Sequence, residues 1–291
     1  MPLKIAMYNH KGGVGKTTDS LILGYGMLNK GKKVLLIDLD AQQYLSLSLL
    51  DTQSLDTTDT TFELAKRQEK IPPKEVKVKL LNGEESSIFV LPTTEQDTVK
   101  MIRGEYPQTD PFALRDVIDQ YNEFDVIIMD LPPQVTPSMW WGLFAAEYVI
   151  IPITASEFSQ YGAYVYAKEV LPRLTRSTKV RTLGFLLGNV IVRNTEKLIS
   201  EVRKDLQEYM GNVVVMYPEL RKYIYKDVVF STVIHQTAEL RFAIRGRDAY
   251  PPVFETLRVS NYPPTVKLRE ATTSVANEVE KRTSNFISLG D

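Results

Sequence analysis

Short apolar runs recur along the chain and predict buried β-strands. Most of these runs lack a strict alternation of apolar and polar residues, as expected for strands that helices cover on both faces. We expect strands over residues 3–8, 33–38, 87–91, 125–130, 148–153 and 182–190.

Between these runs, apolar residues recur at helical spacing. We expect helices over residues 17–30, 110–121, 137–146, 160–176, 195–210 and 267–283. Strands that alternate with helices predict an α/β fold, namely a doubly wound, mostly parallel sheet with helices on both faces.

Two stretches look irregular. Residues 51–75 are rich in Thr, Asp, Lys and Pro and predict a loop with one short helix, and the prolines around 253–264 predict a linker or surface loop. We expect one domain over residues 1–250 and a C-terminal extension over 251–291, packed on the same domain.

Composition narrows the classes of site. The 291 residues carry a net charge of −1, so nucleic-acid binding would need a local patch, and the absence of cysteine excludes disulfides, thiolate metal sites and iron–sulfur clusters. Lys4 interrupts the apolar N-terminus, and no apolar run approaches the roughly 18–20 residues of a membrane span. These features favour a cytoplasmic protein.

The strongest chemical signal is a glycine-rich loop between the first strand and the first helix. Residues 9–18 read Asn-His-Lys-Gly-Gly-Val-Gly-Lys-Thr-Thr. Glycines let successive backbone N–H groups point inward at an anion, and the N-terminus of the following helix adds partial positive charge. The pattern predicts the P-loop NTPase fold. The phosphate-binding loop would be formed by Gly12, Gly13, Val14, Gly15, Lys16, Thr17 and Thr18.

Side chains of the loop have distinct expected roles. Lys16 is expected to reach the β- and γ-phosphates of ATP, the Thr17 hydroxyl to bind Mg²⁺, and Thr18 to donate to the α-phosphate region. His10 stands where a strict phosphate-loop pattern has glycine, and the sequence assigns it no role.

Three aspartates end predicted strands. Asp38 and Asp40 follow the second strand, and Asp130 ends the fourth. Open α/β sheets place ligands at this carboxyl edge. We expect Asp130 to hold Mg²⁺ through a water, Asp38 to lie near the metal, and Asp40 to orient the attacking water. The alternative for the Asp38–Asp40 pair is that both cap a loop.

Lys-Gly-Gly-Val-Gly-Lys-Thr-Thr at 11–18 resembles the deviant Walker A motif of the ParA/MinD class of ATPases. Residues 35–42 and the Asp-Leu-Pro-Pro stretch that begins at Asp130 also resemble this class, although Ala41 replaces its usual proline. The resemblance implies that Lys11 reaches across a dimer to the partner's bound nucleotide, where its charge would offset that of the phosphates.

The same resemblance extends to residues 183–190 and implies that Asn189 meets the adenine edge. The alternative is a strand-end asparagine that serves a turn. Members of the class commonly have Pro-Arg near the base, whereas this chain has His235-Gln236.

Three subfamilies share Lys11. The nitrogenase iron protein and its relatives need cysteine ligands, which this chain lacks. MinD-like proteins end in a basic amphipathic membrane helix, and residues 284–291 are a poor match for one. ParA-type partition ATPases bind DNA non-specifically as ATP dimers.

Local charge favours the DNA-binding subfamily. Residues 173–226 hold eleven basic and five acidic residues, a local balance of +6. The basic residues are Arg173, Arg176, Lys179, Arg181, Arg193, Lys197, Arg203, Lys204, Arg221, Lys222 and Lys226, followed by Arg241, Arg245 and Arg247.

The resemblance therefore implies a ParA-type DNA partition ATPase, with ATP and Mg²⁺ as its ligands. It would form a homodimer on ATP binding, hold DNA non-specifically at the nucleoid, segregate plasmid or chromosomal DNA, and respond to a ParB-like centromere-binding protein. The alternative is a MinD-like positioning ATPase that acts on a membrane or protein scaffold.

Overall fold

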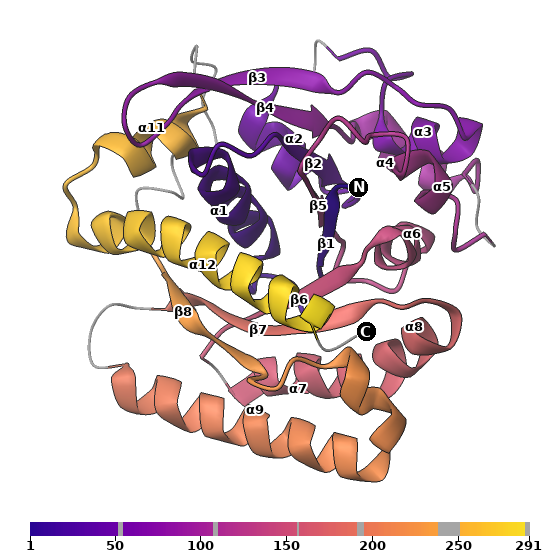
Figure 1. Ribbon diagram of the computed structural model, residues 1–291. Helices are drawn as coiled ribbons and strands as arrows, with labels where there is room; N and C mark the ends of the chain where they lie inside the picture. Colours follow the sequence, from indigo (N-terminus) through magenta and orange to yellow (C-terminus); the bar gives the residue numbers. More distant parts are fainter. Residues whose placement is uncertain (52–54, 107–109, 156, 191–194, 238–250, 289–291) are drawn as a thin grey trace.

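A computed structural model describes residues 1–51, 55–106, 110–155, 157–190, 195–237 and 251–288 (Figure 1). An eight-stranded sheet runs through the molecule, with helices on both faces. The predicted doubly wound α/β fold is therefore confirmed.

The strand order across the sheet is β3-β4-β2-β5-β1-β6-β7-β8. All neighbouring strands are parallel except β3 and β4, which are antiparallel. The strands are β1 (Leu3–Met7), β2 (Val34–Asp38), β3 (Lys74–Lys79), β4 (Glu85–Leu91), β5 (Val126–Asp130), β6 (Tyr148–Ile153), β7 (Arg181–Val190) and β8 (Val229–His235).

The helices divide between the two faces of the sheet. One apolar core lies under α1, α11 and α12, and the other lies under α6 to α9 with shorter helices around them (Figure 1). The α-helices are α1 (Lys16–Asn29), α2 (Tyr44–Leu49), α3 (Thr61–Arg67), α4 (Glu95–Ile102), α5 (Arg115–Ile118), α6 (Pro137–Ala145), α7 (Glu157–Val165), α8 (Leu171–Ser177), α9 (Glu196–Met216), α11 (Pro252–Val259) and α12 (Pro263–Ser288). A π-helical turn, η2 (Tyr166–Val170), joins α7 to α8, and a 3-10 helix, η3 (Pro218–Tyr223), follows α9.

Several elements differ from the sequence prediction. Strands β3 and β8 and helices α2 and α4 were not predicted. The helix predicted over residues 110–121 is reduced to the four residues of α5. The loop or linker predicted at 253–264 is wrong, because α11 and the start of α12 occupy it.

The C-terminal helix α12 packs directly on α1. A Cβ added at Gly26 of α1 would lie 2.3 Å from the carbonyl oxygen of Thr272, so glycine is needed for this close approach. The predicted terminal helix over 267–283 is confirmed and extends further at both ends. The predicted domain boundary at residue 250 falls in the segment 238–250, which lies outside the described residues.

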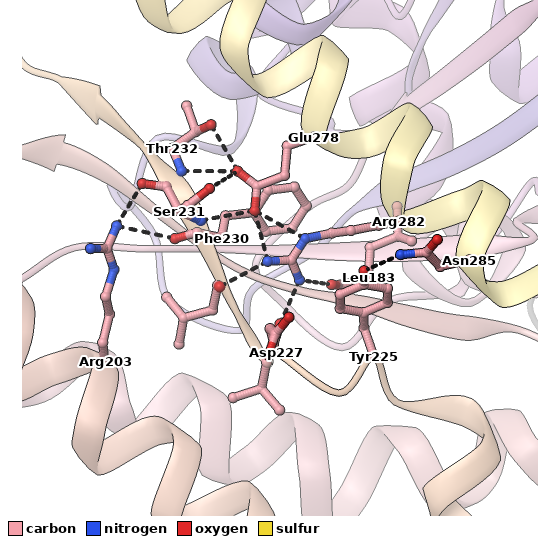
Figure 2. A network of polar contacts seen from close by, with 12 residues as sticks. Leu183, Arg203, Tyr225, Asp227, Phe230, Ser231, Thr232, Glu278, Arg282 and Asn285 are labelled. Atoms are coloured by element: carbon pink, nitrogen blue, oxygen red, sulfur yellow. Dashed lines mark hydrogen bonds and ion pairs between the residues drawn. The ribbon is translucent and has the colours of Figure 1, made fainter.

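A buried arginine fixes the end of α12 to the sheet (Figure 2). Arg282 is only 3% exposed, and all five of its N–H groups donate to Leu183, Asp227, Val229 or Glu278. The Glu278 carboxylate accepts in turn from the backbone and hydroxyl groups of Ser231 and Thr232. Such charge-assisted bonds are among the strong ones, so this network holds α12 against β7 and β8.

Candidate nucleotide-binding site

The glycine loop joins β1 to α1, the arrangement expected of a phosphate loop. Gly13 and Gly15 have φ angles of 75° and 102°, in the left-handed region that glycine adopts at low cost. Helix α1 begins at Lys16, one residue before the predicted start, and Gly15 is its N-cap. The loop therefore directs the positive end of α1 toward an incoming phosphate.

Asn9 anchors the loop to β6. Its side-chain amide donates to the carbonyl oxygen of Pro152 at 2.6 Å, and its Oδ1 accepts from the Lys11 backbone N–H at 2.9 Å. A Cβ at Gly162 of α7 would lie 2.3 Å from Asn9 Oδ1, so this packing needs glycine. The motif contains Asn9, but the sequence analysis gave it no role.

Lys16 lies inside the site. It is 7% exposed, and its Nζ lies 3.4 Å from the Lys11 carbonyl oxygen. Burial lowers the pKa of the Lys16 ammonium, and the nearby carboxylates of Asp130 and Asp40 act in the opposite direction. A buried cation with one long hydrogen bond is suited to receive a polyphosphate.

Thr17 and Asp130, the two residues expected to hold Mg²⁺ together, lie in direct contact. The Thr17 hydroxyl donates to Asp130 Oδ2 at 2.6 Å, and the Ser20 hydroxyl lies 3.3 Å from Asp130 Oδ1. Burial raises the pKa of Asp130 to about 7, despite the hydrogen bond from Thr17 and the charge of Lys16. A fully buried carboxylate of this kind gains from a neighbouring cation.

Asp38 and Asp40 have different surroundings. Both oxygens of the fully buried Asp38 accept hydrogen bonds, Oδ2 from the backbone and hydroxyl of Ser46 and Oδ1 from the Asp40 backbone. Asp40 lines the cavity beside the loop and accepts from the Gln42 backbone at 3.0 Å. The structure therefore brings Asp40 to the cavity and uses Asp38 to hold the β2–α2 turn.

One cavity of about 440 Å³ joins the loop to the carboxyl ends of β7 and β8. Asn189, with a φ of 54°, lines it, and so do His235 and Gln236, which replace the expected Pro-Arg. Its lining also includes Gly12, Gly13, Gly15, Lys16, Thr17, Thr18, Asp19, Asp40, Gln42, Tyr44, Ser48, Pro133, Ile234 and Thr237.

Four residues of the 9–18 segment lie outside this lining, namely Asn9, His10, Lys11 and Val14. Val14 is buried in the protein, and the half-buried Lys11 begins the loop. The Nδ1 atom of His10 is buried and has no hydrogen-bond partner among the described residues, so its role stays unassigned.

Asp19 is an acidic residue of the site that the sequence analysis missed. Its carboxylate is 1% exposed, has no hydrogen-bond partner in the described part of the chain, and lies beneath Gly15 and Gly188. Burial raises the pKa of Asp19 well above its ordinary value, and the charge of Asp130 adds to this effect. In the sequence, an acidic residue in the first turn of α1 looks like a favourable partner of the helix dipole. The sequence therefore does not show that this carboxylate is buried without a hydrogen bond among the described residues.

The predicted basic stretch separates into several environments. Arg203 donates to the carbonyl oxygens of Phe230 and Ser231 on the edge strand β8, so it braces the sheet (Figure 2). Arg193 and the group Arg241, Arg245 and Arg247 lie outside the described residues. Among the described residues, no helix has the length and apolar character that crossing a membrane requires.

Comparison with known proteins identifies the family. A family model described as an AAA domain matches residues 3–179. The chromosome-partitioning ATPase Soj of Thermus thermophilus is 29% identical over 215 residues, which cover 72% of this chain and 78% of the relative.

Solved structures agree with the fold. The structure of pNOB8 ParA superposes with a TM-score of 0.84 at 23% identity, covering 98% of this chain and 99% of that one. A second structure, pNOB8 ParA bound to nonspecific DNA, gives a TM-score of 0.82 at the same identity and coverage. A plasmid partition protein of Borrelia burgdorferi bound to AMPPNP gives 0.64 at 19% identity, covering 96% of this chain and all of that one.

The deviant phosphate loop, the carboxylates at the sheet edge and these relatives agree, and the chain belongs to the ParA/MinD family of P-loop ATPases.

Proposed function

We propose that this protein is an ATP-dependent dimeric switch that binds DNA non-specifically and segregates plasmid or chromosomal DNA. The observation that carries the proposal is the cavity in which the phosphate loop, Lys16, Thr17 and Asp40 meet. Relatives named as chromosome-partitioning ATPases, and a ParA solved on nonspecific DNA, support the biological role.

The phosphates of ATP would be held by the loop. Backbone N–H groups of Gly12, Gly13, Val14 and Gly15 face an anion in this type of loop, and Lys16 would contact the β- and γ-phosphates. Thr18 would donate to the α-phosphate, and Asn189 would meet the adenine, since an amide offers both a donor and an acceptor.

The oxygen ligands at the site fit Mg²⁺. Thr17 and Asp130 lie side by side, and burial raises the pKa of the Asp130 carboxyl to about 7 despite the nearby charge of Lys16. We propose that both residues hold Mg²⁺, with Asp130 acting through a water. Asp38 accepts hydrogen bonds from Ser46 and would support the site by holding the turn that follows β2. The ion would neutralise charge on the phosphates.

Hydrolysis would use Asp40 and Lys11. Asp40 lines the cavity and would orient the attacking water. Lys11 would cross to the nucleotide of the partner protomer and stabilise the charge of the transition state. This role makes hydrolysis dependent on dimerisation, which is what a switch requires.

The cycle would run at the nucleoid in the cytoplasm. ATP binding would form the dimer, the dimer would hold bulk DNA, and a ParB-like centromere-binding protein would stimulate slow hydrolysis and release it. The second candidate, a MinD-like positioning ATPase on a membrane or protein scaffold, shares the same loop.

DNA binding under three nucleotide conditions tests the proposal. Purified protein is titrated against a labelled random-sequence duplex with ATP and Mg²⁺, with ADP, or without nucleotide. We expect tight binding with ATP alone. Equal binding under all three conditions would contradict the switch, and co-sedimentation with anionic liposomes in place of DNA would favour the MinD-like candidate.

A further inference from the structure

Five basic side chains from two separate segments converge on one cavity. Lys179 and Arg181 lie at the start of β7, whereas Arg221, Lys222 and Lys226 lie in and just after η3. This cavity, which we call the basic groove, has a volume of about 790 Å³, and no acidic residue among those that the structure describes lines it. Residues about 40 positions apart in sequence therefore form one positive surface.

The positive charge of the groove is available to a ligand. Among the described residues, none of these five side chains forms an ion pair with a carboxylate, and four of them are exposed. Only Arg181 is half-buried, with its guanidinium 5.5 Å from the ring centre of Phe286. Like charges gathered without counter-charges repel one another, so a bound anion would relieve the repulsion.

The floor of the groove is a fixed apolar surface. Tyr225 and Phe286 are each 5% exposed, and their rings pack edge to face with centres 5.5 Å apart. Asn285 donates to the Tyr225 hydroxyl at 2.7 Å, and the Arg282 guanidinium lies 4.6 Å from the centre of that ring (Figure 2). The end of α12 thus holds the groove in shape, and the basic residues stand at its rim.

The groove lies far from the nucleotide cavity. Strand β7 runs from Arg181 at the groove to Asn189 at the cavity, and the eight steps between them span about 26 Å at roughly 3.3 Å each. A ligand in the groove would therefore not compete with ATP. A dimer that closes on its nucleotides would keep one groove on each protomer.

We propose that the basic groove binds the phosphate backbone of duplex DNA. Lysine and arginine side chains are the usual donors to the phosphate oxygens of DNA. Contacts to the backbone carry no sequence information, and the one amide in the groove, Asn285, already bonds Tyr225. Two grooves in a dimer would strengthen binding by avidity. This inference rests on the proposed DNA-binding function.

Charge reversal tests the groove. The variant Arg221→Glu/Lys222→Glu/Lys226→Glu changes three exposed residues, and Lys66→Glu/Lys77→Glu/Arg103→Glu makes the same charge change at exposed positions of α3, β3 and the end of α4. Binding of each variant to a random duplex is measured by fluorescence anisotropy in the presence of a non-hydrolysable ATP analogue. The salt concentration is varied from about 50 to about 200 mM.

The groove variant should bind DNA at least about tenfold more weakly, with a salt slope lower by about 0.9 for each phosphate that the protein no longer neutralises. The control variant should keep the wild-type slope, and both should keep basal ATP hydrolysis. A milder variant with glutamine at the three groove positions should lie between them, and it serves if the glutamate variant fails to fold.

Two other results would overturn the proposal in distinguishable ways. If wild type binds DNA and the groove variants bind with an unchanged slope, the groove is wrong and the DNA-binding function stands. If wild type with ATP binds no DNA, the proposed function fails and the groove proposal fails with it.

Discussion

The two ends of β7 carry sites of opposite construction. At its carboxyl end, the nucleotide cavity joins the phosphate loop to residues that follow other strands, and polar groups such as Thr17 and the buried Asp130 are bonded to each other. At its amino end, the basic groove is assembled from distant segments and presents exposed, unpaired charges.

This difference sets the size of effect that a substitution should have. Buried charged and hydrogen-bonded groups lose much when one partner is removed, because the other remains desolvated. Exposed cations act additively through screened charge, so each contributes little. Single changes should disable the cavity, whereas the groove should weaken by steps.

Lys16→Ala should have the largest effect. It removes a cation buried among the phosphate-binding groups, so ATP affinity and hydrolysis should each fall on the order of 100-fold or more. Calorimetric titration of ATP and a phosphate-release assay measure the two quantities. Lys66→Ala, at an exposed position of α3, is the control, and near-normal ATP binding by Lys16→Ala would contradict the assignment.

Lys11→Ala should separate binding from dimerisation. If Lys11 acts across the dimer, a single protomer should bind ATP within a few-fold of wild type. Hydrolysis should fall on the order of 1,000-fold, as for loss of a trans-acting arginine finger, and ATP-dependent dimers should disappear in light scattering. Retained dimerisation and hydrolysis would remove the cross-subunit role.

Asp40→Asn should separate hydrolysis from the steps before it, namely ATP binding, dimer formation and DNA binding. The amide keeps the shape of the side chain but cannot accept the proton of the attacking water, so turnover should fall on the order of 100-fold. Dimer formation and DNA binding with ATP should persist and last longer. Rapid hydrolysis by this variant would move the role to another residue, and Asp38→Asn is the matched comparison.

Asp130 should make the stability of the nucleotide-free protein depend on pH. Its folded pKa of about 7 lies above the ordinary 3.8, so its ionisation opposes folding and stability is lost as pH rises through this range. Each pKa unit corresponds to about 1.4 kcal/mol. Since about 1 kcal/mol moves Tm by roughly 2–4 °C at this size, Asp130→Asn should gain several degrees over wild type between pH 5 and pH 8.

Differential scanning fluorimetry from pH 5 to pH 8 measures this change. The charges of Lys16 and Asp40 contribute to the Asp130 shift, and the charge of Asp130 in turn raises the pKa of the buried carboxyls of Asp19 and Asp38. ATP with Mg²⁺ should reduce the pH dependence of wild type because a cation then faces Asp130. A constant difference between wild type and Asp130→Asn across the range would contradict the shift.

The same contrast explains what the sequence could predict. Strands β1, β2, β5 and β6 are apolar on both faces and were predicted, as were the loop and the strand-end Asp130. Strand β3 reads Lys-Glu-Val-Lys-Val-Lys, and its charged edge position conceals it. The prolines that predicted a loop at 253–264 instead occupy the first turns of α11 and α12, where a missing N–H costs nothing.

Tertiary contacts decided the remainder of the site. The local sequence does not show that Asn9 donates a hydrogen bond to Pro152 or that Ser46 donates to Asp38. Nor does it show that Asp19 is buried beneath Gly188. The charge of residues 173–226 was visible in the sequence. Which of its cations share a groove depends on how β7, η3 and α12 pack together.

The central claim is that the nucleotide bound at one end of β7 controls DNA binding at the other end. Hydrogen–deuterium exchange of the amides in residues 218–226 tests it directly, with and without a random duplex. We predict that DNA protects this segment in the presence of a non-hydrolysable ATP analogue and leaves it unprotected with ADP. No protection with the analogue, or equal protection with ADP, would contradict the account.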